Sequence, residues 1–298
     1  IIGRLVGSEM CIRDRSKAVA LSGTAAVLVS ALDGTVTDAA GDKIEGNVTI
    51  SNTPTEAQLK TINDATNASI QIPAANQTFT GTAAVLAAAL TGTVTGPLAA
   101  ALSGAVSVSD GAGESVAATL LSTIATGTSG TVTVGAAINI TGTADQVVAA
   151  LDTNGVVAST ATITLDDTPT VTELQTLNGK TSGAIKIANG AITYSANADV
   201  LAAALDGTVT DGSGNSLTGN MTIAAAGGNP NATQLQTINN ATTGTVFVPD
   251  KTVNLTGTAA QLSEGLAGTV TDGSGNSLTG NIIITCLLYT SPSPRDDR

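Results

Sequence analysis

The chain has no histidine and no tryptophan, and only two cysteines, two tyrosines and two phenylalanines among its 298 residues. Without histidine, the most common general base and metal ligand of enzymes is missing. The scarcity of aromatic side chains leaves no platform on which nucleotide bases could stack. Since no run of 18 or more apolar residues occurs, we expect no transmembrane helix. These absences disfavour most enzymes, nucleic-acid-binding proteins and membrane proteins.

Both cysteines and all five arginines lie within the terminal residues 1–15 and 286–298. The segment VGSEMCIRD at residues 6–14 and the segment CLLYTSPSPRD at residues 286–296 are similar to translations of the two strands of a sequencing adapter. We therefore interpret residues 1–15 and 286–298 as adapter-derived and leave them out of the reasoning about fold. On this interpretation Cys11 and Cys286 are neither a disulfide nor a metal-binding pair.

Between these ends the chain is acidic, since residues 16–285 hold 19 of the 23 acidic residues and six lysines as their cations. A negatively charged chain without arginine lacks the side chains that contact phosphates, so we expect no nucleic-acid partner. The apolar residues are mainly Ala, Val, Ile and Leu, whose small side chains form thin cores. A stacked, elongated body is therefore expected in preference to one large globule.

Internal repeats of about 60 residues organise residues 16–285. A first segment type, LSGTAAVLVSALDGTVTD at residues 21–38, returns at Phe79, Ile140, Tyr194 and Leu255. A second type, TPTEAQLKTINDATNASIQI at residues 53–72, returns at Thr168 and Asn229, with a degenerate copy at Glu114. Each segment is expected to form a helix followed by a strand.

The apolar spacing within the repeats predicts the buried helical faces. In the first type the pairs four apart are Leu28/Leu32, Leu86/Leu90, Val147/Leu151, Leu201/Leu205 and Leu262/Leu266. In the second type the pairs three apart are Leu59/Ile62, Leu174/Leu177 and Leu235/Ile238. The glycines that end the first helices are Gly34, Gly92, Gly207 and Gly268. Residues 53–56 predict a capping box with proline at the first helical position, and Asn229-Pro230 repeats this signal.

Alternating apolar and polar residues after the helices predict short strands, for example at residues 35–37, 69–72, 131–134 and 245–248. A half-unit of roughly 30 residues then contains a helix, a strand, a corner and a second strand. The sequence therefore predicts an α/β fold, in the form of a repeat solenoid of short helix-strand-strand units whose adjacent repeats stack on one another. Tandem small α+β domains remain the alternative.

The motif DGSGNSLTGN is identical at residues 211–220 and 272–281, and DAAGDKIEGN at residues 38–47 is related to it. Its oxygen-bearing side chains resemble the start of a calcium-binding loop, although no acidic residue closes the loop at the twelfth position. The candidate metal ligands are Asp38, Asp211, Asn215, Asp272 and Asn276. A tight turn is favoured over a calcium site because Asp, Gly and Asn dominate turns for backbone reasons. No other cofactor is expected.

Threonines two positions apart on the predicted strands would form ranks able to order water and to bind ice. These pairs are Thr35/Thr37, Thr93/Thr95, Thr131/Thr133, Thr208/Thr210 and Thr269/Thr271. Threonine is also simply a favourable strand residue. No nucleophile has a histidine base, and the serines have only lysine or carboxylate partners at unknown distance, so we expect no enzymatic activity.

The acidic repeats, rich in Thr, Asn and Gly and free of cysteine, resemble those of giant bacterial cell-surface and adhesin-type repeat proteins, particularly of aquatic species. The resemblance covers residues 16–285 and implies an extracellular or cell-surface protein. It also implies a structural or adhesive role, as a stalk or as a binding surface for an unidentified surface or matrix ligand. The alternatives are a calcium-stabilised extracellular module and an ice-binding threonine array.

Overall fold

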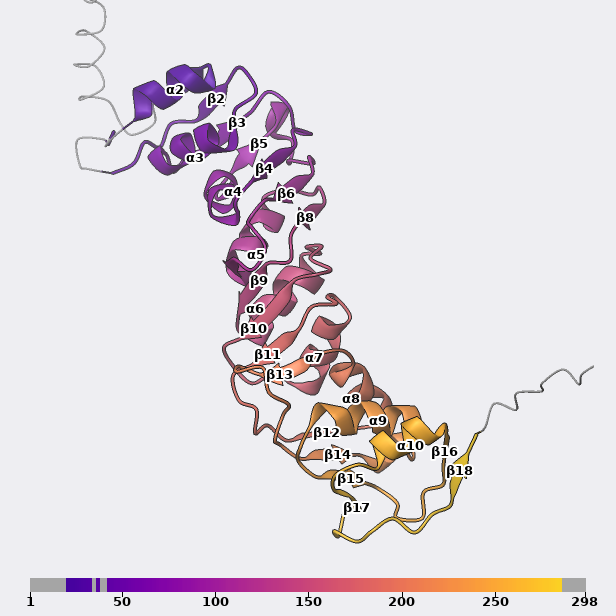
Figure 1. Ribbon diagram of the computed structural model, residues 1–298. Coiled ribbons are helices and arrows are strands. Elements are labelled where there is room, and N and C mark those ends of the chain that lie inside the picture. Colours follow the sequence, from indigo (N-terminus) through magenta and orange to yellow (C-terminus); the bar gives the residue numbers. More distant parts are fainter. Residues whose placement is uncertain (1–19, 34–35, 38–41, 286–298) are drawn as a thin grey trace, which may run out of the picture. The chain divides into compact units, whose positions relative to one another are not determined.

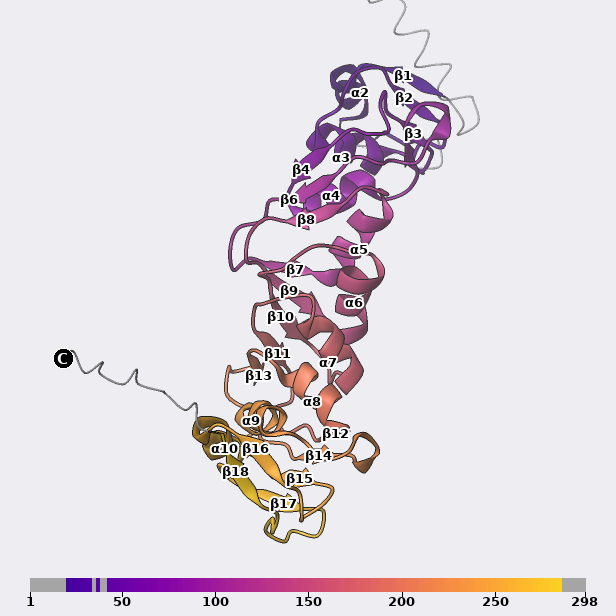
Figure 2. The same cartoon turned by 90° about the vertical axis from the view of Figure 1, so that its right-hand side faces the viewer.

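The computed structural model describes residues 20–33, 36–37 and 42–285, which divide into two compact units. The first unit runs to Asp166 and includes Lys180–Gly183, and the second holds Asp167–Gly179 together with the residues from Ala184 onward. In both units short helices alternate with short strands along the chain (Figure 1). The same alternation can be followed in the turned view (Figure 2).

The helices of the first unit contact one another in chain order, from α2 to η2. They are α2 (Ala25–Leu32), α3 (Glu56–Ala65), α4 (Ala83–Leu90), α5 (Ala118–Thr126) and α6 (Ala144–Val148), followed by the π-helical turn η2 (Ala149–Thr153). The strands are β1 (Leu21–Gly23), β2 (Val48–Ile50), β3 (Ile70–Gln71), β4 (Phe79–Gly81), β5 (Val94–Thr95), β6 (Val106–Val108), β7 (Ser115–Ala117), β8 (Val132–Val134), β9 (Asn139–Gly142) and β10 (Thr162–Leu165), with a short turn η1 (Pro97–Ala99). They pair in the orders β1-β2-β3-β5, β4-β6-β8 and β7-β9-β10.

The second unit has the same organisation, and its helices also contact one another in chain order. They are α7 (Val171–Asn178), α8 (Ala198–Leu205), α9 (Ala232–Ala241) and α10 (Ala259–Gly265). The strands are β11 (Ile185–Ile187), β12 (Tyr194–Ala196), β13 (Val209–Asp211), β14 (Met221–Ile223), β15 (Val246–Val248), β16 (Leu255–Gly257), β17 (Val270–Asp272) and β18 (Ile282–Ile284), with a short turn η3 (Ala225–Gly227). They pair in the orders β11-β13, β12-β14-β15-β17 and β16-β18.

The two strands that flank a first-type helix belong to different sheets. Strands β4 and β5 flank α4, yet β4 pairs with β6 whereas β5 pairs with β3. Likewise β16 and β17 flank α10, yet β16 pairs with β18 whereas β17 pairs with β15. Because these pairings are parallel, and because helices join the strands, the predicted α/β class is confirmed. Within each unit, a helix of one repeat thus connects two successive sheets.

The core consists of the predicted helical faces together with the inward residues of the strands. Leu28, Leu32, Leu86, Leu90 and their equivalents are buried, and the second-type pair Leu59 and Ile62 is completely inaccessible. In the last copy Leu262 is buried but Leu266 is only half-buried, because α10 ends at Gly265 and no longer directs the next residue inward. The apolar spacing of the sequence therefore located the core in all but one of these positions.

The predicted strands at residues 69–72, 131–134 and 245–248 are confirmed as β3, β8 and β15. Val36 and Thr37 belong to no strand, so the strand predicted there is wrong over these two residues, and its first residue lies outside the described part of the chain. Gly92, Gly207 and Gly268 have φ of 80°, 78° and 69°, which confirms them as left-handed helix terminators. Gly34 lies outside the described residues.

The capping boxes begin two residues later than predicted. In α3 the hydroxyl of Thr55, not that of Thr53, accepts the N–H of Gln58 at 3.3 Å, while the Thr55 N–H donates to the Gln58 side chain at 3.0 Å. The pattern Thr-x-x-Glu/Gln occurs twice here in overlapping positions, and spacing alone does not distinguish them. Pro54 therefore precedes the cap instead of opening the helix. The same boxes are Thr143/Gln146, Thr170/Glu173, Asn231/Gln234 and Thr258/Gln261.

Glycines near the start of several strands allow two segments of backbone to approach closely. A Cβ atom at Gly219 would lie 1.7 Å from the carbonyl oxygen of Ile192, and one at Gly280 would lie 1.8 Å from that of Val253. Gly104 stands in the same relation to Gln77. Any other residue would force these backbones apart, so glycine sets the distance between successive repeats at these positions.

Candidate functional site

Asp211, the first candidate metal ligand, begins a tight turn and hydrogen-bonds within it. Its Oδ1 accepts the backbone N–H groups of Ser213 at 2.9 Å and of Asn215 at 2.8 Å, and Gly214 supplies a φ of 86°. The side-chain amide of Asn215 donates to the second carboxylate oxygen at 3.3 Å. The equivalent residues of the next copy repeat these bonds, namely Asp272, Ser274 and Asn276. Each aspartate therefore serves as the acceptor that closes its own turn.

These hydrogen bonds lower the pKa of both carboxyl groups. At Asp211 the backbone N–H of Asn215 contributes most to the lowered pKa, and at Asp272 the side-chain amide of Asn276 does. Throughout residues 20–33, 36–37 and 42–285, no three side chains of the types His, Cys, Asp or Glu gather as a metal-binding group. The four candidates described here form two separate turns, and the fifth, Asp38, lies outside the described residues.

Residues 96–100 form a turn at the equivalent position of their repeat without an aspartate. The N–H of Gly96 donates to the carbonyl of Ala100 at 2.8 Å, as the N–H of Asp211 does to the carbonyl of Asn215 at 2.8 Å. Here Leu98 and Ala99 adopt φ of 57° and 59°, a region unfavourable for side chains other than glycine. The side chain of Leu98 is 98% exposed at the tip. The two turns thus share the hydrogen bond that closes them but differ in backbone conformation, since Gly214 is the residue of positive φ in the turn at Asp211.

The predicted threonine ranks are interrupted by other residues. The register places Gln71 opposite Thr95, and Phe247 opposite Thr271. Two more threonines of the predicted pairs lie within paired strands. Thr133 is opposite Ser107, and Thr210 is opposite Lys186. An ice-binding surface needs a regular array, and this register does not supply one. The ice-binding alternative therefore gains no support from the strand pairing.

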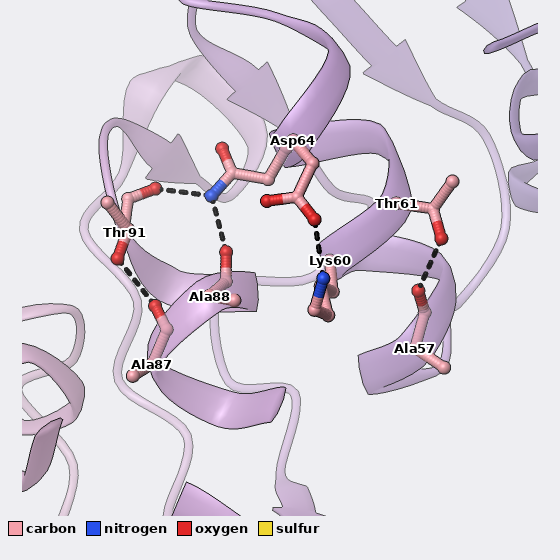
Figure 3. A network of polar contacts seen from close by, with 8 residues as sticks. Ala57, Lys60, Thr61, Asp64, Ala87, Ala88 and Thr91 are labelled. Carbon is pink, nitrogen blue, oxygen red and sulfur yellow. Dashed lines mark hydrogen bonds and ion pairs between the residues drawn. The ribbon is translucent and has the colours of Figure 1, made fainter. Parts of the chain in front are cut away.

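The recurring polar residue of the second-type helices is an asparagine that bonds to the next repeat. The Nδ2 of Asn63, near the end of α3, donates to the carbonyl oxygens of Ala88 and Thr91 at 2.7 Å each (Figure 3). Both acceptors lie at the end of α4, where carbonyl groups have no partner within their own helix. The hydroxyl of Thr91 donates to the carbonyl of Ala87 at 2.6 Å in the same cluster. One side chain thus completes the hydrogen bonding of its neighbour's helix end.

The same arrangement recurs in the second unit. The Nδ2 of Asn178 donates to the carbonyls of Ala203 and Asp206, and that of Asn239 to the carbonyls of Glu264 and Ala267 at 2.8 Å each. Asn239 is only 8% exposed, so these bonds are shielded from water. We call Asn63, Asn178 and Asn239 the asparagine ladder.

Threonines that follow these helices bond in the opposite direction, to the preceding repeat. The hydroxyl of Thr242 donates to the carbonyl of Gly219 at 2.6 Å and accepts the N–H of Gly244 at 2.9 Å. Thr66, Thr128 and Thr181 make the equivalent pairs of bonds. Second-type segments that carry the asparagine are therefore bonded to a neighbour on each side by side chains that their sequence repeats.

The degenerate copy shows what happens without the asparagine. Ala125 stands where the other copies have asparagine, so it offers no side-chain donor to the next helix. That helix, α6, does not end like the others but continues into η2, whose carbonyls at Ala149 and Ala150 accept the N–H groups of Asn154 and Val156. The helix end is thus satisfied by its own chain where the ladder is absent.

Tyr194 is the deeply buried titratable group of the described residues, and its position is a core position. It aligns with Leu21, Phe79, Ile140 and Leu255, and its hydroxyl has no hydrogen-bond partner. Burial raises the pKa of this hydroxyl above its ordinary value, and the charge of Glu173 adds to the effect. The phenol therefore remains protonated and packs as an apolar ring does.

Surface hollows on these units lie between helix ends. One of about 310 Å³ is lined in part by Asn63, Thr66 and Thr91, which already bond to neighbouring backbone. Another of about 390 Å³ lies against Asp206, Gln236 and Asn240.

No described helix has both the length and the apolar character that crossing a membrane requires.

Sequence reasoning missed the asparagine ladder, the threonine bonds and the close-approach glycines. A signal for the ladder was present, because Leu-x-Thr-Ile/Leu-Asn occurs at residues 59–63, 174–178 and 235–239.

No known protein family, curated protein sequence or solved structure matches this chain.

Proposed function

We propose that residues 16–285 are a structural repeat segment, an α/β solenoid that serves as a stalk or display surface outside the cell and has no enzymatic activity. The observation that carries this proposal is the asparagine ladder. Asn63, Asn178 and Asn239 recur at one position of the repeat, and each directs its two donors to the end of the next helix. An asparagine that recurs at one position and bonds to the next helix is what a chain of stacked repeats requires.

The sheet pairing supports stacking over independent small domains. Because α4 joins the sheet of β4 to that of β5, neither sheet could be separated without breaking a strand from its helix. Repeat arrays of this kind derive their stability from contacts between nearest neighbours. The described residues of each unit are bonded in this way from one repeat to the next.

Composition supports a role in solvent outside the cell. The six lysines and 19 acidic residues of the repeat region give it a strong negative charge, which keeps a long array soluble and repels like chains. The exposed turns at Leu98, Ser213 and Ser274 lie at equivalent positions of their repeats, so they are where a surface or matrix ligand would be contacted.

Small-angle X-ray scattering of the whole chain tests the solenoid. A compact domain of 298 residues has a radius of gyration of about 19 Å. A stacked array gives a distinctly larger value, together with a cross-section that stays constant when a second copy of residues 16–285 is joined in tandem. A radius near that of a globule would refute the proposal. Surface labelling of intact source cells tests the location.

A further inference from the structure

Asparagine is followed directly by glycine at residues 178–179 and 189–190 of the second unit. In this dipeptide the backbone nitrogen of the glycine can attack the side-chain amide carbon of the asparagine, because glycine has no Cβ to hinder the approach. The attack forms a five-membered succinimide ring and releases ammonia. In a folded chain the rate depends on the hydrogen bonds of the glycine N–H, of the side-chain carbonyl and of the side-chain amino group.

Asn189 lies at the corner that follows β11, and its side chain folds over the next peptide group. Its Oδ1 accepts the N–H of Ala191 at 3.0 Å. This bond holds the amide carbon beside the nitrogen of Gly190 and polarises the carbonyl on which negative charge develops during the attack. Asn189 is exposed, and the N–H of Gly190 donates to no acceptor within the described part of the chain. The nucleophile is therefore free and the electrophile is activated.

Asn178, a member of the asparagine ladder, is held in the opposite way. Its Nδ2, the atom that would leave as ammonia, donates to the carbonyls of Ala203 and Asp206. The N–H of Gly179 donates to the carbonyl of Gln175 at 3.2 Å, so the attacking nitrogen is bonded as well. The same dipeptide is thus restrained at one position and free to react at the other.

Glycine follows Asn189 for a packing reason. A Cβ at Gly190 would lie 2.7 Å from the Cβ of Asp211, so the corner approaches this turn only without a side chain. The equivalent corner after β15 has Asp250, whose Oδ1 accepts the N–H of Thr252 at 2.8 Å. The pKa of Asp250 is lowered, chiefly by the hydroxyl of Thr252, so this carboxyl stays ionised and resists nucleophilic attack. At Asn189 a reactive amide occupies the same turn.

We propose that Asn189–Gly190 is a self-modifying site, which converts to aspartate and isoaspartate without an enzyme, while the asparagine ladder protects Asn178–Gly179. The bond between the Gly190 nitrogen and the Asn189 amide carbon forms as the bond from that carbon to Nδ2 breaks. The proton of the Gly190 N–H ends on the ammonia that departs. Water then opens the succinimide at either of its carbonyl groups, which yields aspartate or isoaspartate. Each product carries one more negative charge than asparagine.

The two products differ in their effect on the next repeat. Aspartate leaves the main chain unchanged, and Asp250 shows that the corner accommodates it. Isoaspartate brings its side-chain CH₂ into the main chain just before Gly190, whose carbonyl accepts the N–H groups of Thr218 at 2.7 Å and Gly219 at 3.2 Å. The added atom displaces this carbonyl from its donors. Formation of isoaspartate therefore loosens the contact between the corner and the segment that leads into β14.

The test is a time course of the whole chain at mildly alkaline pH, with peptide mass spectrometry to locate each conversion of an amide to an acid. In the folded chain Asn189 should convert about 30-fold faster than Asn178, because two hydrogen bonds of ordinary strength must first break at Asn178. In denaturant, where these bonds are lost, the difference should disappear. Asn189→Gln is the matched control, because its longer side chain would have to close a less favourable six-membered ring. The peptide that holds residue 189 should be labelled by a protein isoaspartate methyltransferase, and this label should be absent from the control.

Equal rates at Asn189 and Asn178 in the folded chain would overturn the inference. So would a folded chain in which Asn189 stays intact while the denatured chain converts, or an undiminished label in Asn189→Gln. Hydrogen exchange tests the consequence, since the amides of Thr218 and Gly219 should exchange faster in the converted chain than in Asn189→Asp. Equal exchange would refute the loosening. None of these rates depends on the shape of the array, so this inference and the proposed function can fail independently.

Discussion

Replacing Asn239 with alanine removes both hydrogen bonds that its amide donates to the end of α10. The acceptors are the carbonyls of Glu264 and Ala267, each at 2.8 Å. A typical intramolecular hydrogen bond contributes about 1 kcal/mol, so the expected loss is about 2 kcal/mol. The shielding of Asn239, which is 8% exposed, keeps water from replacing the lost donor fully.

In a repeat array this loss is local, because each repeat is stabilised by its neighbours rather than by the whole chain. Native-state hydrogen exchange is therefore the suitable assay. The amides of residues 259–272, in α10 and β17, should exchange about 30-fold faster, which corresponds to about 2 kcal/mol. The amides of the first unit should not change.

Asn240 supplies the matched control on the same helix. Its amide donates to the exposed carboxylate of Glu264 at 3.1 Å, so Asn240→Ala should change stability by less than about 0.5 kcal/mol. At neutral pH, Asn239→Asp should destabilise the helix end more than Asn239→Ala does, because a carboxylate would then face two carbonyl oxygens. If Asn239→Ala and Asn240→Ala accelerate exchange equally, the asparagine ladder does not stabilise the array.

Four further outcomes are expected. Gly219→Ala should lower the free energy of unfolding by about 1–3 kcal/mol, because the added Cβ would overlap the carbonyl oxygen of Ile192. Gly212→Ala is the control and should have little effect, since its Cβ would have room. Denaturant titration of the two variants compares them. Tyr194→Phe should raise that free energy by about 1 kcal/mol, since it removes a buried hydroxyl without a partner, and a decrease would reveal an unseen bond. The lowered pKa of Asp211 means that its bonds stabilise the turn above the ordinary carboxyl pKa and are lost as the pH falls through the lowered value; an NMR titration with an ordinary midpoint would contradict this. Calcium should not shift the melting temperature, because the Asp211 carboxylate already closes its own turn, and a rise reversed by chelator would restore the calcium alternative.

The sequence predicted features that depend on neighbours along the chain. The spacing of Leu86 and Leu90, or of Leu59 and Ile62, fixes a helical face, and burial follows from it. The left-handed conformation of Gly92 likewise follows from its place directly after Thr91, the C-cap residue of α4. Such features can be recognised from a few residues because neighbours along the chain determine them.

The order of the strands could not be predicted in this way. Nothing near residues 94–95 indicates that β5 pairs with β3 and that β4, which precedes it, belongs to another sheet. The role of Asn63 was hidden for the same reason, since its acceptors lie 25 and 28 residues away. The candidate ligands Asp211 and Asn215 were correctly placed together in a turn, but composition could not show that their bonds close on themselves.

The division of each helix's flanking strands between two sheets constrains how such a gene can change in length. Adding a single helix-strand half would leave the following strand opposite a partner of the wrong type, because β2 requires β3 on one side and β1 on the other. Gain or loss of a complete unit of about 60 residues preserves every pairing. Recombination between copies is therefore expected to leave a folded product only when it adds or removes complete units. Natural variants should then differ in length by whole multiples of one repeat unit.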